Sequence, residues 1–320
     1  MRPLQAPLAE EQAGAASFFL RRFMNAIRIT FIFLRASIFL VVLSLGLEAK
    51  LADTIWLARR PRLFLRSLLA MNVIMPLVAV ALAWTSWLNP AVKIALVFLA
   101  ASPVPPVLPR KQSKLGGSSD YIHGLLFSAA LLSIVIVPLT IKLVARLFGQ
   151  DVHVGPGEVA KIVATSVLLP FAAGIILRRI APGLAQRIAQ PLSGIAFLIL
   201  VAAAGALLVA ALPGMLALIG NGTVLAIVIF VVIGVVVGHL LGGPDPGERT
   251  VLALATASRH PGVAIVLATA NYPDRARTVA AAILLYMLVS GVVLVPYSSW
   301  RRHRLRSSQL GDSPPEQRAA

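Results

Sequence analysis

The sequence predicts an all-α polytopic membrane protein. Of its 320 residues, 58% are hydrophobic and only 13% are charged, and the mean hydropathy is +0.87. Soluble domains carry about 25% charged residues, so this composition is outside their usual range. The apolar residues also form many separate runs, most of them long enough to cross the ~30 Å hydrocarbon core of a bilayer as a helix. We therefore expect the lipid bilayer to be the chain's main partner.

Nine apolar runs predict nine transmembrane helices, with breakers such as Asn89-Pro90 between them. Their expected bounds are about 29–49, 63–85, 92–108, 119–147, 158–178, 190–212, 218–241, 248–271 and 277–299. Residues 29–300 are thus expected to form one membrane domain. An amphipathic interfacial segment at 1–28 precedes it, and a basic, then disordered cytoplasmic tail at 301–320 follows it.

The basic residues predict the orientation. Lysine and arginine gather in the loops after the first, third and fifth spans and in the C-terminal tail. By the positive-inside rule these segments face the cytoplasm of the inner (plasma) membrane. The N-terminus then lies outside although it carries Arg21, Arg22 and Arg28, so a tenth, less apolar crossing there stays open. The net charge of +17 is explained by this distribution, and we expect no nucleic-acid partner.

Charged and polar residues inside the spans are few. The chain has no cysteine, and all acidic residues lie at span ends or in loops. No pair of carboxylates and no histidine-rich cluster is available for catalysis or metal binding. We therefore expect neither an enzyme nor a cofactor or metal site.

One span combines a charge with helix breakers. Arg259 and His260 lie in the middle of the apolar run from Val251 to Ala270, and Pro261 and Gly262 follow directly. A charge at the bilayer centre costs ~3 kcal/mol on insertion scales and usually faces a cavity or a partner. Proline removes a helical hydrogen bond, so we expect the helix to break at the charge.

A second break is predicted in the third span. Four prolines between residues 103 and 109 prevent a continuous helix; they are Pro103, Pro105, Pro106 and Pro109. Pro103 precedes Pro138 by 35 residues, and Pro261 precedes Pro296 by the same interval. Matching interruptions indicate a transporter built from inverted repeats, here about 29–147 and 158–299, with its site where the breaks meet. Coincidence is the alternative, because prolines are common in membrane helices.

Several segments together resemble the bile acid:sodium symporter family. They are Ser44–Glu48, Arg59-Arg60-Pro61, Asn72–Pro76, Ala101-Ser102-Pro103, Val163–Arg179 and Arg249–Pro273. The resemblance implies a panel domain, a core domain of inverted repeats, two crossing discontinuous helices and alternating access. It also implies a divergent bacterial-type member that lacks the first of the usual ten helices.

The departures from the family pattern concern sodium. The family's sodium-site glutamate falls near Ala255 or Thr256, and Arg259 and His260 stand where the family has Gln-Asn. A glutamine of the third helix is replaced by Met71, and the Ser-Asn pair of the fourth falls near Leu108 and Pro109. A fixed guanidinium repels sodium, so we interpret Arg259 as supplying the charge that sodium supplies elsewhere.

The candidate substrate-binding residues are the polar side chains closest to the two breaks: Arg259, His260, Ser258, Thr256, Ser102, Asn72, Ser128 and Ser133. Each has a structural alternative. Arg259 can lock the core through a backbone carbonyl or Asp120, and His260 can be a satisfied core histidine rather than a proton carrier. The hydroxyls can bond their own helices, and Asn72 can bridge two helices.

These patterns predict a secondary transporter of a small organic anion, independent of sodium. A guanidinium suits a carboxylate or sulfonate because its planar fork donates two parallel hydrogen bonds. A channel or passive uniporter on the same fold, a sodium-coupled bile-acid-type symporter, and a membrane enzyme or receptor are the alternatives. If an ion is coupled, a proton is favoured, although Arg259 opposes a charge on His260.

Overall fold

A computed structural model describes residues 29–311, and in this range it shows the expected all-helical membrane protein. Eight of the described helices are long and apolar enough to cross a bilayer: Ile29–Glu48, Pro61–Ala83, Ser119–Leu147, Pro156–Ile180, Pro182–Leu216, Thr223–Leu241, Pro246–Asn271 and Pro273–Ser307. The remaining expected span is the shorter helix Pro90–Ala101. Each of the nine apolar runs therefore has a helix.

Several of these spans consist of more than one element. After the helix Ile29–Glu48 the elements are α2 (Leu51–Trp56), α3 (Pro61–Leu68), η1 (Leu69–Ile74), α4 (Met75–Ala83), α5 (Pro90–Ala101), α6 (Leu108–Lys114), α7 (Ser119–Leu147), α8 (Pro156–Val163), η2 (Ala164–Leu168), α9 (Leu169–Ile180), α10 (Pro182–Leu216), α11 (Thr223–Leu241), α12 (Pro246–Ala257), α13 (Pro261–Asn271), η3 (Pro273–Arg275) and α14 (Ala276–Gly311).

Proline and a capping side chain define several helix starts. Asn89 precedes Pro90, and its side-chain oxygen accepts a hydrogen bond from the Ala91 amide at 2.9 Å. Asp245 precedes Pro246 in the same way and accepts from the Glu248 amide at 2.8 Å. Proline suits the first helical position because its missing N–H has no partner there.

The span Pro61–Ala83 contains a π-helical turn, η1, followed by a proline. In this turn the Met75 amide donates to the Ala70 carbonyl, five residues back. The next donor in that register would come from Pro76, which has no N–H. The Met71 carbonyl is therefore left without its helical donor and is available to another side chain.

The same device recurs in the span Pro156–Ile180. There the Leu169 amide donates to the Ala164 carbonyl, and Pro170 follows, so the Thr165 carbonyl loses its helical donor. The two spans can therefore be compared, since each contains a π-helical turn followed by a proline and a carbonyl without its helical donor.

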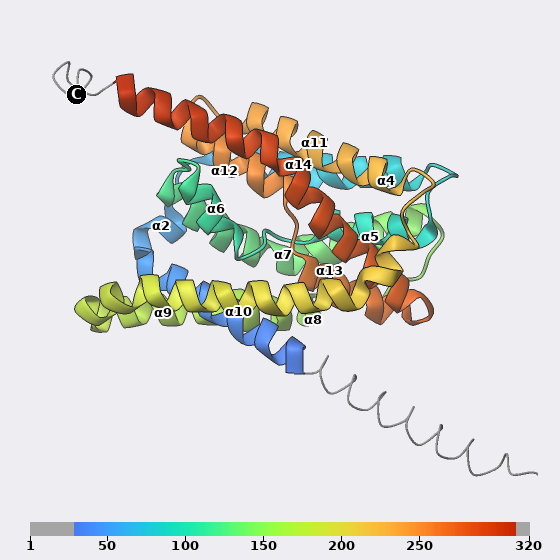
Figure 1. Ribbon diagram of the computed structural model, residues 1–320, viewed down its shortest axis with the longest axis horizontal. Helices are drawn as coiled ribbons and strands as arrows, with labels where there is room; N and C mark the ends of the chain where they lie inside the picture. Colours follow the sequence, from blue (N-terminus) through green and yellow to red (C-terminus); the bar gives the residue numbers. More distant parts are fainter. Residues whose placement is uncertain (1–28, 312–320) are drawn as a thin grey trace, which may run out of the picture.

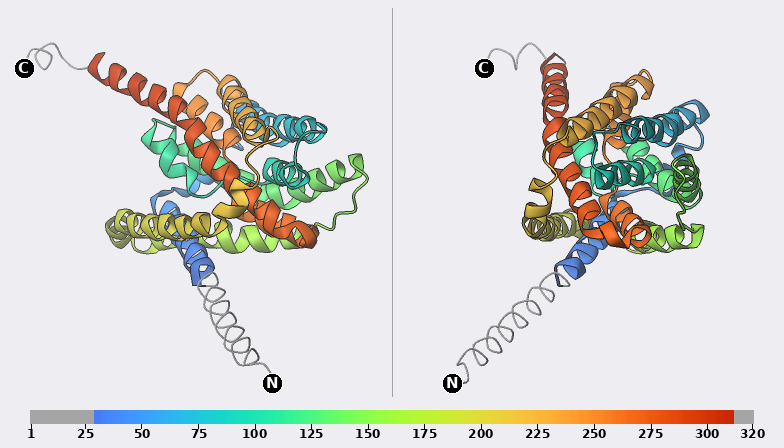
Figure 2. Two further views of the ribbon diagram at one scale, coloured as in Figure 1. Left: turned by 45° about the vertical axis from the view of Figure 1, so that its right-hand side comes forward. Right: turned by 90° about the vertical axis from the view of Figure 1, so that its right-hand side faces the viewer.

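The helices form two layers (Figures 1 and 2). The helix Ile29–Glu48, α8 with α9, and α10 lie along one side, at the bottom of Figure 1. The larger bundle above them contains α3 to α7 and α11 to α14. Contacts of α7 with α8 and of α10 with α14 join the two layers.

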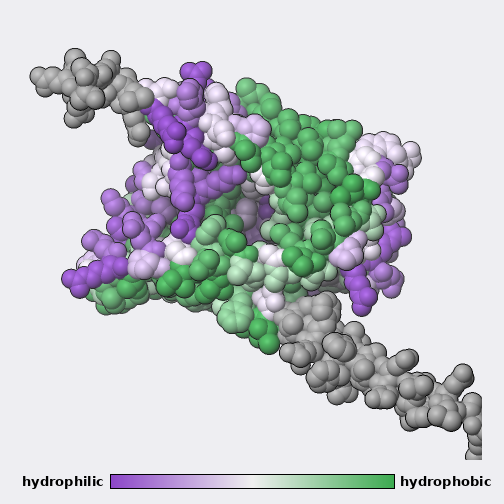
Figure 3. All heavy atoms as spheres, in the orientation of Figure 1, coloured by the Kyte–Doolittle hydropathy of each residue, from purple (hydrophilic) through white to green (hydrophobic). Residues whose placement is uncertain are grey.

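Burial differs sharply between helices. In the most apolar window of the broken helix Pro246–Asn271, 72% of residues are buried, compared with 11% in α10. Broken backbone at membrane depth must be enclosed by protein, whereas a continuous helix can face lipid. Figure 3 shows the outer surface that results, with hydrophobic residues in the middle and hydrophilic residues towards both ends.

Some expected boundaries need correction. The third span ends at Ala101 rather than near residue 108, because Pro103 interrupts it. Residues 301–311 are helical rather than part of a disordered tail, because no proline or glycine occurs between Pro296 and Gly311. The interfacial segment 1–28 and residues 312–320 lie outside the described residues. The inverted repeats and the panel and core domains stay predictions.

Candidate functional site at the two helix breaks

The first break, residues 102–107, follows α5. The Ser102 amide still donates to the Phe98 carbonyl at 3.0 Å, and the Ser102 hydroxyl donates to the Leu99 carbonyl at 2.7 Å. The Ser102 carbonyl has no such continuation, because the residues three and four positions later are Pro105 and Pro106. The proline run thus leaves an acceptor at the end of α5.

The second break, residues 258–260, separates α12 from α13. Pro261 is the first residue of α13, and His260 is its N-cap, with ring Nδ1 accepting from the Val263 amide at 3.4 Å. Gly262 leaves room for this ring, since a Cβ there would be 3.1 Å from Cε1 of His260. Because Nδ1 accepts, the neutral ring carries its proton on Nε2.

The two breaks touch each other. The His260 amide donates to the Pro103 carbonyl at 3.0 Å. Arg259 Nη1 donates to the Ser102 carbonyl at 3.2 Å. Segments more than 150 positions apart are therefore joined at the point where both helices are interrupted, as the proline pattern predicted.

Arg259 is buried and connects a third helix to the breaks. Its exposed fraction is 2%, and Nη2 donates to the Met71 carbonyl at 2.5 Å. This is the carbonyl that Pro76 deprives of its helical donor. Nε has no partner, and no ion pair joins Arg259 to a carboxylate among the described side chains. The guanidinium charge is therefore buried without a counter-charge.

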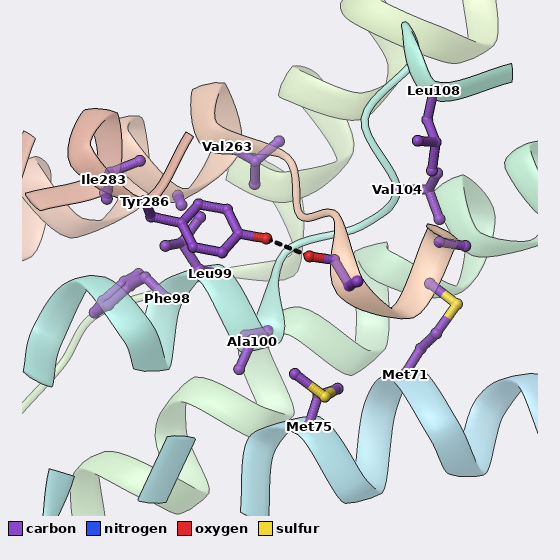
Figure 4. Packing of buried hydrophobic residues seen from close by; sticks show 14 of the residues in the cluster. Met71, Met75, Phe98, Leu99, Ala100, Val104, Leu108, Val263, Ile283 and Tyr286 are labelled. Atoms are coloured by element: carbon purple, nitrogen blue, oxygen red, sulfur yellow. Dashed lines mark hydrogen bonds between the residues drawn. The ribbon is translucent and has the colours of Figure 1, made fainter. Parts of the chain in front are cut away.

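Tyr286 on α14 completes the turn around Arg259. Its hydroxyl donates to the Ala257 carbonyl at 2.7 Å and accepts from the Arg259 amide at 3.1 Å. Figure 4 shows the ring near Leu99, with the bond to Ala257 dashed. One hydroxyl thus forms hydrogen bonds with a backbone carbonyl and a backbone amide that have no helical partners at the break.

Close packing holds α12 in place beside α11. A Cβ at Gly234 would lie 2.8 Å from the Cα of Ala257, and a Cβ at Gly238 would lie 2.5 Å from the Leu252 carbonyl. Two glycines four residues apart lie on the same helix face and let two backbones approach closely. The end of α12 is therefore fixed against α11 immediately before the break.

The other expected site residues are less directly connected. Thr256 is fully buried, and its hydroxyl has no hydrogen-bond partner, while Ser258 is half-buried. Asn72 is half-buried on η1, next to Met71. The Ser133 hydroxyl donates to the Ala130 carbonyl of its own helix.

Ser128 lies half-buried on α7. Within the described residues, no hydrogen bond joins Ser128 or Ser133 to either break. Pro109 is also separate from the contact, since it is the second residue of α6.

Two contributors to the site were not recognised from the sequence. Tyr286 was not selected, although a tyrosine in the middle of the last apolar run was a usable signal. The Met71 carbonyl was also missed, because hydropathy contains no information on the hydrogen-bond register of a helix. The motif Asn72–Pro76 was noted for its resemblance and for the Asn72 side chain, not for a free carbonyl.

Surface cavities lie at the far ends of the two half-helices. One, of about 490 Å³, is lined by Arg60, Arg66 and Glu248 beside the start of α12. The other, of about 450 Å³, is lined by Lys93, Phe98 and Tyr272 beside the end of α13. The contact between the breaks lies between these two ends and is closed in the structure, since Ser102, Arg259 and His260 are all buried.

Comparison with known proteins identifies the family. The family model of the sodium bile acid symporters matches residues 36–218, more than half of the chain. The chain belongs to the sodium bile acid symporter family. The match covers the first break and the span Pro61–Ala83, which supplies Met71. It confirms the resemblance noted above, and no curated protein matches the chain.

Membership assigns the chain to a family of membrane transporters, not enzymes. Together with the apolar helices it implies a protein that crosses the membrane several times and moves a small solute. Within residues 29–311 no group of three His, Asp or Glu side chains is placed to hold a metal ion.

Proposed function

We propose that the chain is a secondary transporter that moves a small organic anion by alternating access, without sodium. The observation that carries the proposal is Arg259, a buried guanidinium that bonds main-chain carbonyls of two other helices and has no carboxylate partner among the described residues. The proposal includes the orientation expected from the sequence, with the C-terminus in the cytoplasm of the inner membrane.

An anion suits the site for electrostatic reasons. A lone charge at the bilayer centre costs ~3 kcal/mol or more, and a bound anion offsets this cost. Nε of Arg259, Nε2 of His260 and the Thr256 hydroxyl are buried polar atoms without partners, and the first two are donors. The N-terminus of α13 adds a positive dipole end beside them. A carboxylate or sulfonate would supply the acceptors that these donors lack.

The guanidinium also argues against sodium. Carbonyls at broken helices are the groups that coordinate sodium in transporters of this architecture. Here the Met71 and Ser102 carbonyls already accept from Arg259. A sodium ion ~4 Å from the guanidinium would be repelled by ~4 kcal/mol at an effective dielectric constant of 20. We therefore interpret Arg259 as a built-in cation in place of a transported one.

Uptake into proteoliposomes tests the proposal. Purified protein is reconstituted, and uptake of radiolabelled carboxylates and sulfonates, including benzoate and taurocholate, is compared in sodium and choline media at fixed pH and voltage. We expect saturable uptake of at least one anion at equal rates in both media, and its loss in Arg259→Met.

Three outcomes would contradict the proposal. A saturable sodium requirement would overturn sodium independence. Uptake that never exceeds equilibrium under any imposed gradient would indicate a passive uniporter or channel. Normal uptake by Arg259→Met, in protein that melts like the wild type, would remove Arg259 from the site.

A further inference from the structure

A buried acidic and basic pair lies away from the helix breaks, between α2 and α7. His123 Nδ1 is 4.0 Å from Asp53 Oδ2, and the two residues are 6% and 8% exposed. This distance is too long for a hydrogen bond, and Nδ1 has no other hydrogen-bond partner. Two titratable groups are thus enclosed together without a completed contact.

The carboxylate of this pair is held in place. Asp53 Oδ2 accepts from the Lys50 amide at 2.8 Å, an arrangement that caps the start of α2. The backbone of α2 also lies directly against α7, since a Cβ on Gly124 would be 3.0 Å from the Asp53 carbonyl. His123 therefore faces an acceptor whose position is fixed by the backbone.

The pair lies where the two layers meet. α2 connects the helix Ile29–Glu48 of the smaller layer to α3 of the larger bundle. The His123 ring lies 6.3 Å from the ring of Phe171 on α9, which belongs to the smaller layer. The imidazole therefore lies beside elements of both layers.

The charged groups around the ring are of both signs. Asp53 on α2 and Asp120 on α7 act on His123 with negative charge, and Arg178 on α9 acts with positive charge. Arg178 is also occupied, because its Nη1 donates to the Leu47 and Glu48 carbonyls. By contrast, His260 has the guanidinium of Arg259 as its neighbour in the chain.

A proton would complete the contact that the structure leaves open. In the protonated ring both nitrogens are donors, so Nδ1–H can bond Asp53 once the gap closes. The buried negative charge is neutralised in the same step. The closed contact would join α7 to α2 through a charged hydrogen bond, beside Phe171 of the smaller layer.

We propose that Asp53 and His123 form the proton-binding site that couples anion transport to the proton gradient. The inference rests on the proposed function, because it names the ion that drives the same transport cycle. Proton binding at the junction of the layers would favour one arrangement of the layers over the other.

The test measures proton movement and anion exchange separately. Wild-type protein, His123→Gln and Asp53→Asn are reconstituted with a pH-sensitive dye inside the vesicles. Taurocholate, a sulfonate that stays ionised and does not carry protons across lipid by itself, is added at equal pH on both sides, and the internal pH is followed. Exchange of labelled for unlabelled anion is measured in the same preparations, because exchange needs no net proton movement.

We expect the wild type to change the internal pH when the anion is added. Both variants should reduce this proton flux by about tenfold or more, the factor that corresponds to a coupling free energy of typical size. Both variants should keep most of the exchange activity. His153→Gln, at an exposed histidine, is the matched control and should behave like the wild type.

The outcomes separate the two proposals. Absence of anion exchange in the wild type would overturn the proposed function itself. Exchange without any proton movement in the wild type would overturn only the proton site. Full proton flux in both variants would do the same. Loss of exchange as well as flux in both variants would show that the pair is structural, which also overturns the inference.

Discussion

The first helix break, residues 102–107, contains three prolines and no charged side chain, whereas the second, residues 258–260, contains Arg259 and His260. The prolines leave carbonyl acceptors without donors, and the second break supplies donors from a side chain and an amide. The two interruptions are therefore complementary in hydrogen bonding although they differ in sequence. The two breaks also differ in charge, because only the second carries a fixed cation, Arg259.

The largest effect should come from removing the charged partner. In Arg259→Met the Met71 and Ser102 carbonyls lose their donor, and each hydrogen bond to a charged group is worth ~1.5–3 kcal/mol. We expect anion uptake to fall by roughly 100-fold or more. Arg259→Lys should retain part of the activity, because an ammonium cannot reproduce the planar fork.

Arg277→Met, at an exposed arginine on α14, is the control for Arg259→Met. Initial uptake rates and thermal midpoints are measured for all variants. Equal losses at Arg259 and Arg277 would show that positive charge in general, rather than the contact between the breaks, supports transport.

A smaller effect should follow from restoring a helical donor to the span Pro61–Ala83. Pro76→Ala supplies an N–H that can bond the Met71 carbonyl and compete with Arg259. One charged hydrogen bond is weakened, so uptake should fall by about tenfold. The rate is compared with that of Pro170→Ala.

Pro170→Ala makes the same change in α9, where the released carbonyl belongs to Thr165 and does not contact Arg259. Its uptake should stay close to that of the wild type. If both proline variants lose the same activity, the π-helical turns act through helix shape and the Met71 carbonyl has no special role.

A still smaller effect is expected at the hydroxyl beside the second break. Tyr286→Phe removes the bonds to the Ala257 carbonyl and the Arg259 amide. Hydrogen bonds between membrane helices average ~0.6 kcal/mol and reach ~1.7, so we expect a loss of stability of about 1 kcal/mol. Denaturation in detergent micelles measures it.

Tyr297→Phe removes a tyrosine hydroxyl on the same helix that bonds His239, away from both breaks. It should lower stability by a similar amount and leave uptake unchanged, whereas Tyr286→Phe should also reduce uptake. Unchanged uptake in both variants would separate Tyr286 from the site.

The smallest effect concerns α6, which follows the first break. Burial, followed by repulsion from Arg302, lowers the pKa of Lys111 from its usual 10.5. The unfolded chain then binds more protons between the lowered pKa and 10.5, so unfolding free energy should rise with pH in that window. Thermal midpoints on alkaline titration measure the slope.

Lys111→Met should remove this slope, because the group that titrates is gone. Lys114→Met is the matched control on the same helix and affects an exposed side chain. A slope that persists unchanged in Lys111→Met would assign the pH dependence to other groups.

Much of the fold follows from the sequence, since hydropathy and prolines determine where a chain can cross a bilayer and where its helices must stop. The contact between the breaks also follows, because Arg259, His260 and the prolines near Pro103 all need an enclosed position. The helical extension to Gly311 was missed because its residues are polar and have no hydropathic signal.

The site itself was predicted only in part. Arg259 was identified by its charge, but the choice of Met71 as its partner depends on a π-helical turn that only the backbone reveals. Tyr286 and the pair of Asp53 and His123 depend on which helix faces are neighbours, which no local pattern specifies. Ser133 illustrates the opposite case, a candidate whose hydroxyl bonds its own helix.

The bond from the His260 amide to the Pro103 carbonyl determines how fast this amide exchanges its hydrogen with solvent. This amide belongs to one break and its acceptor to the other, so it can exchange with deuterium only when the two breaks separate. Its exchange lifetime is therefore a clock for how often the contact opens. Bound anion should slow exchange of the His260 amide if it holds the breaks together. It should leave the exchange rate unchanged if the two breaks move together as a rigid body.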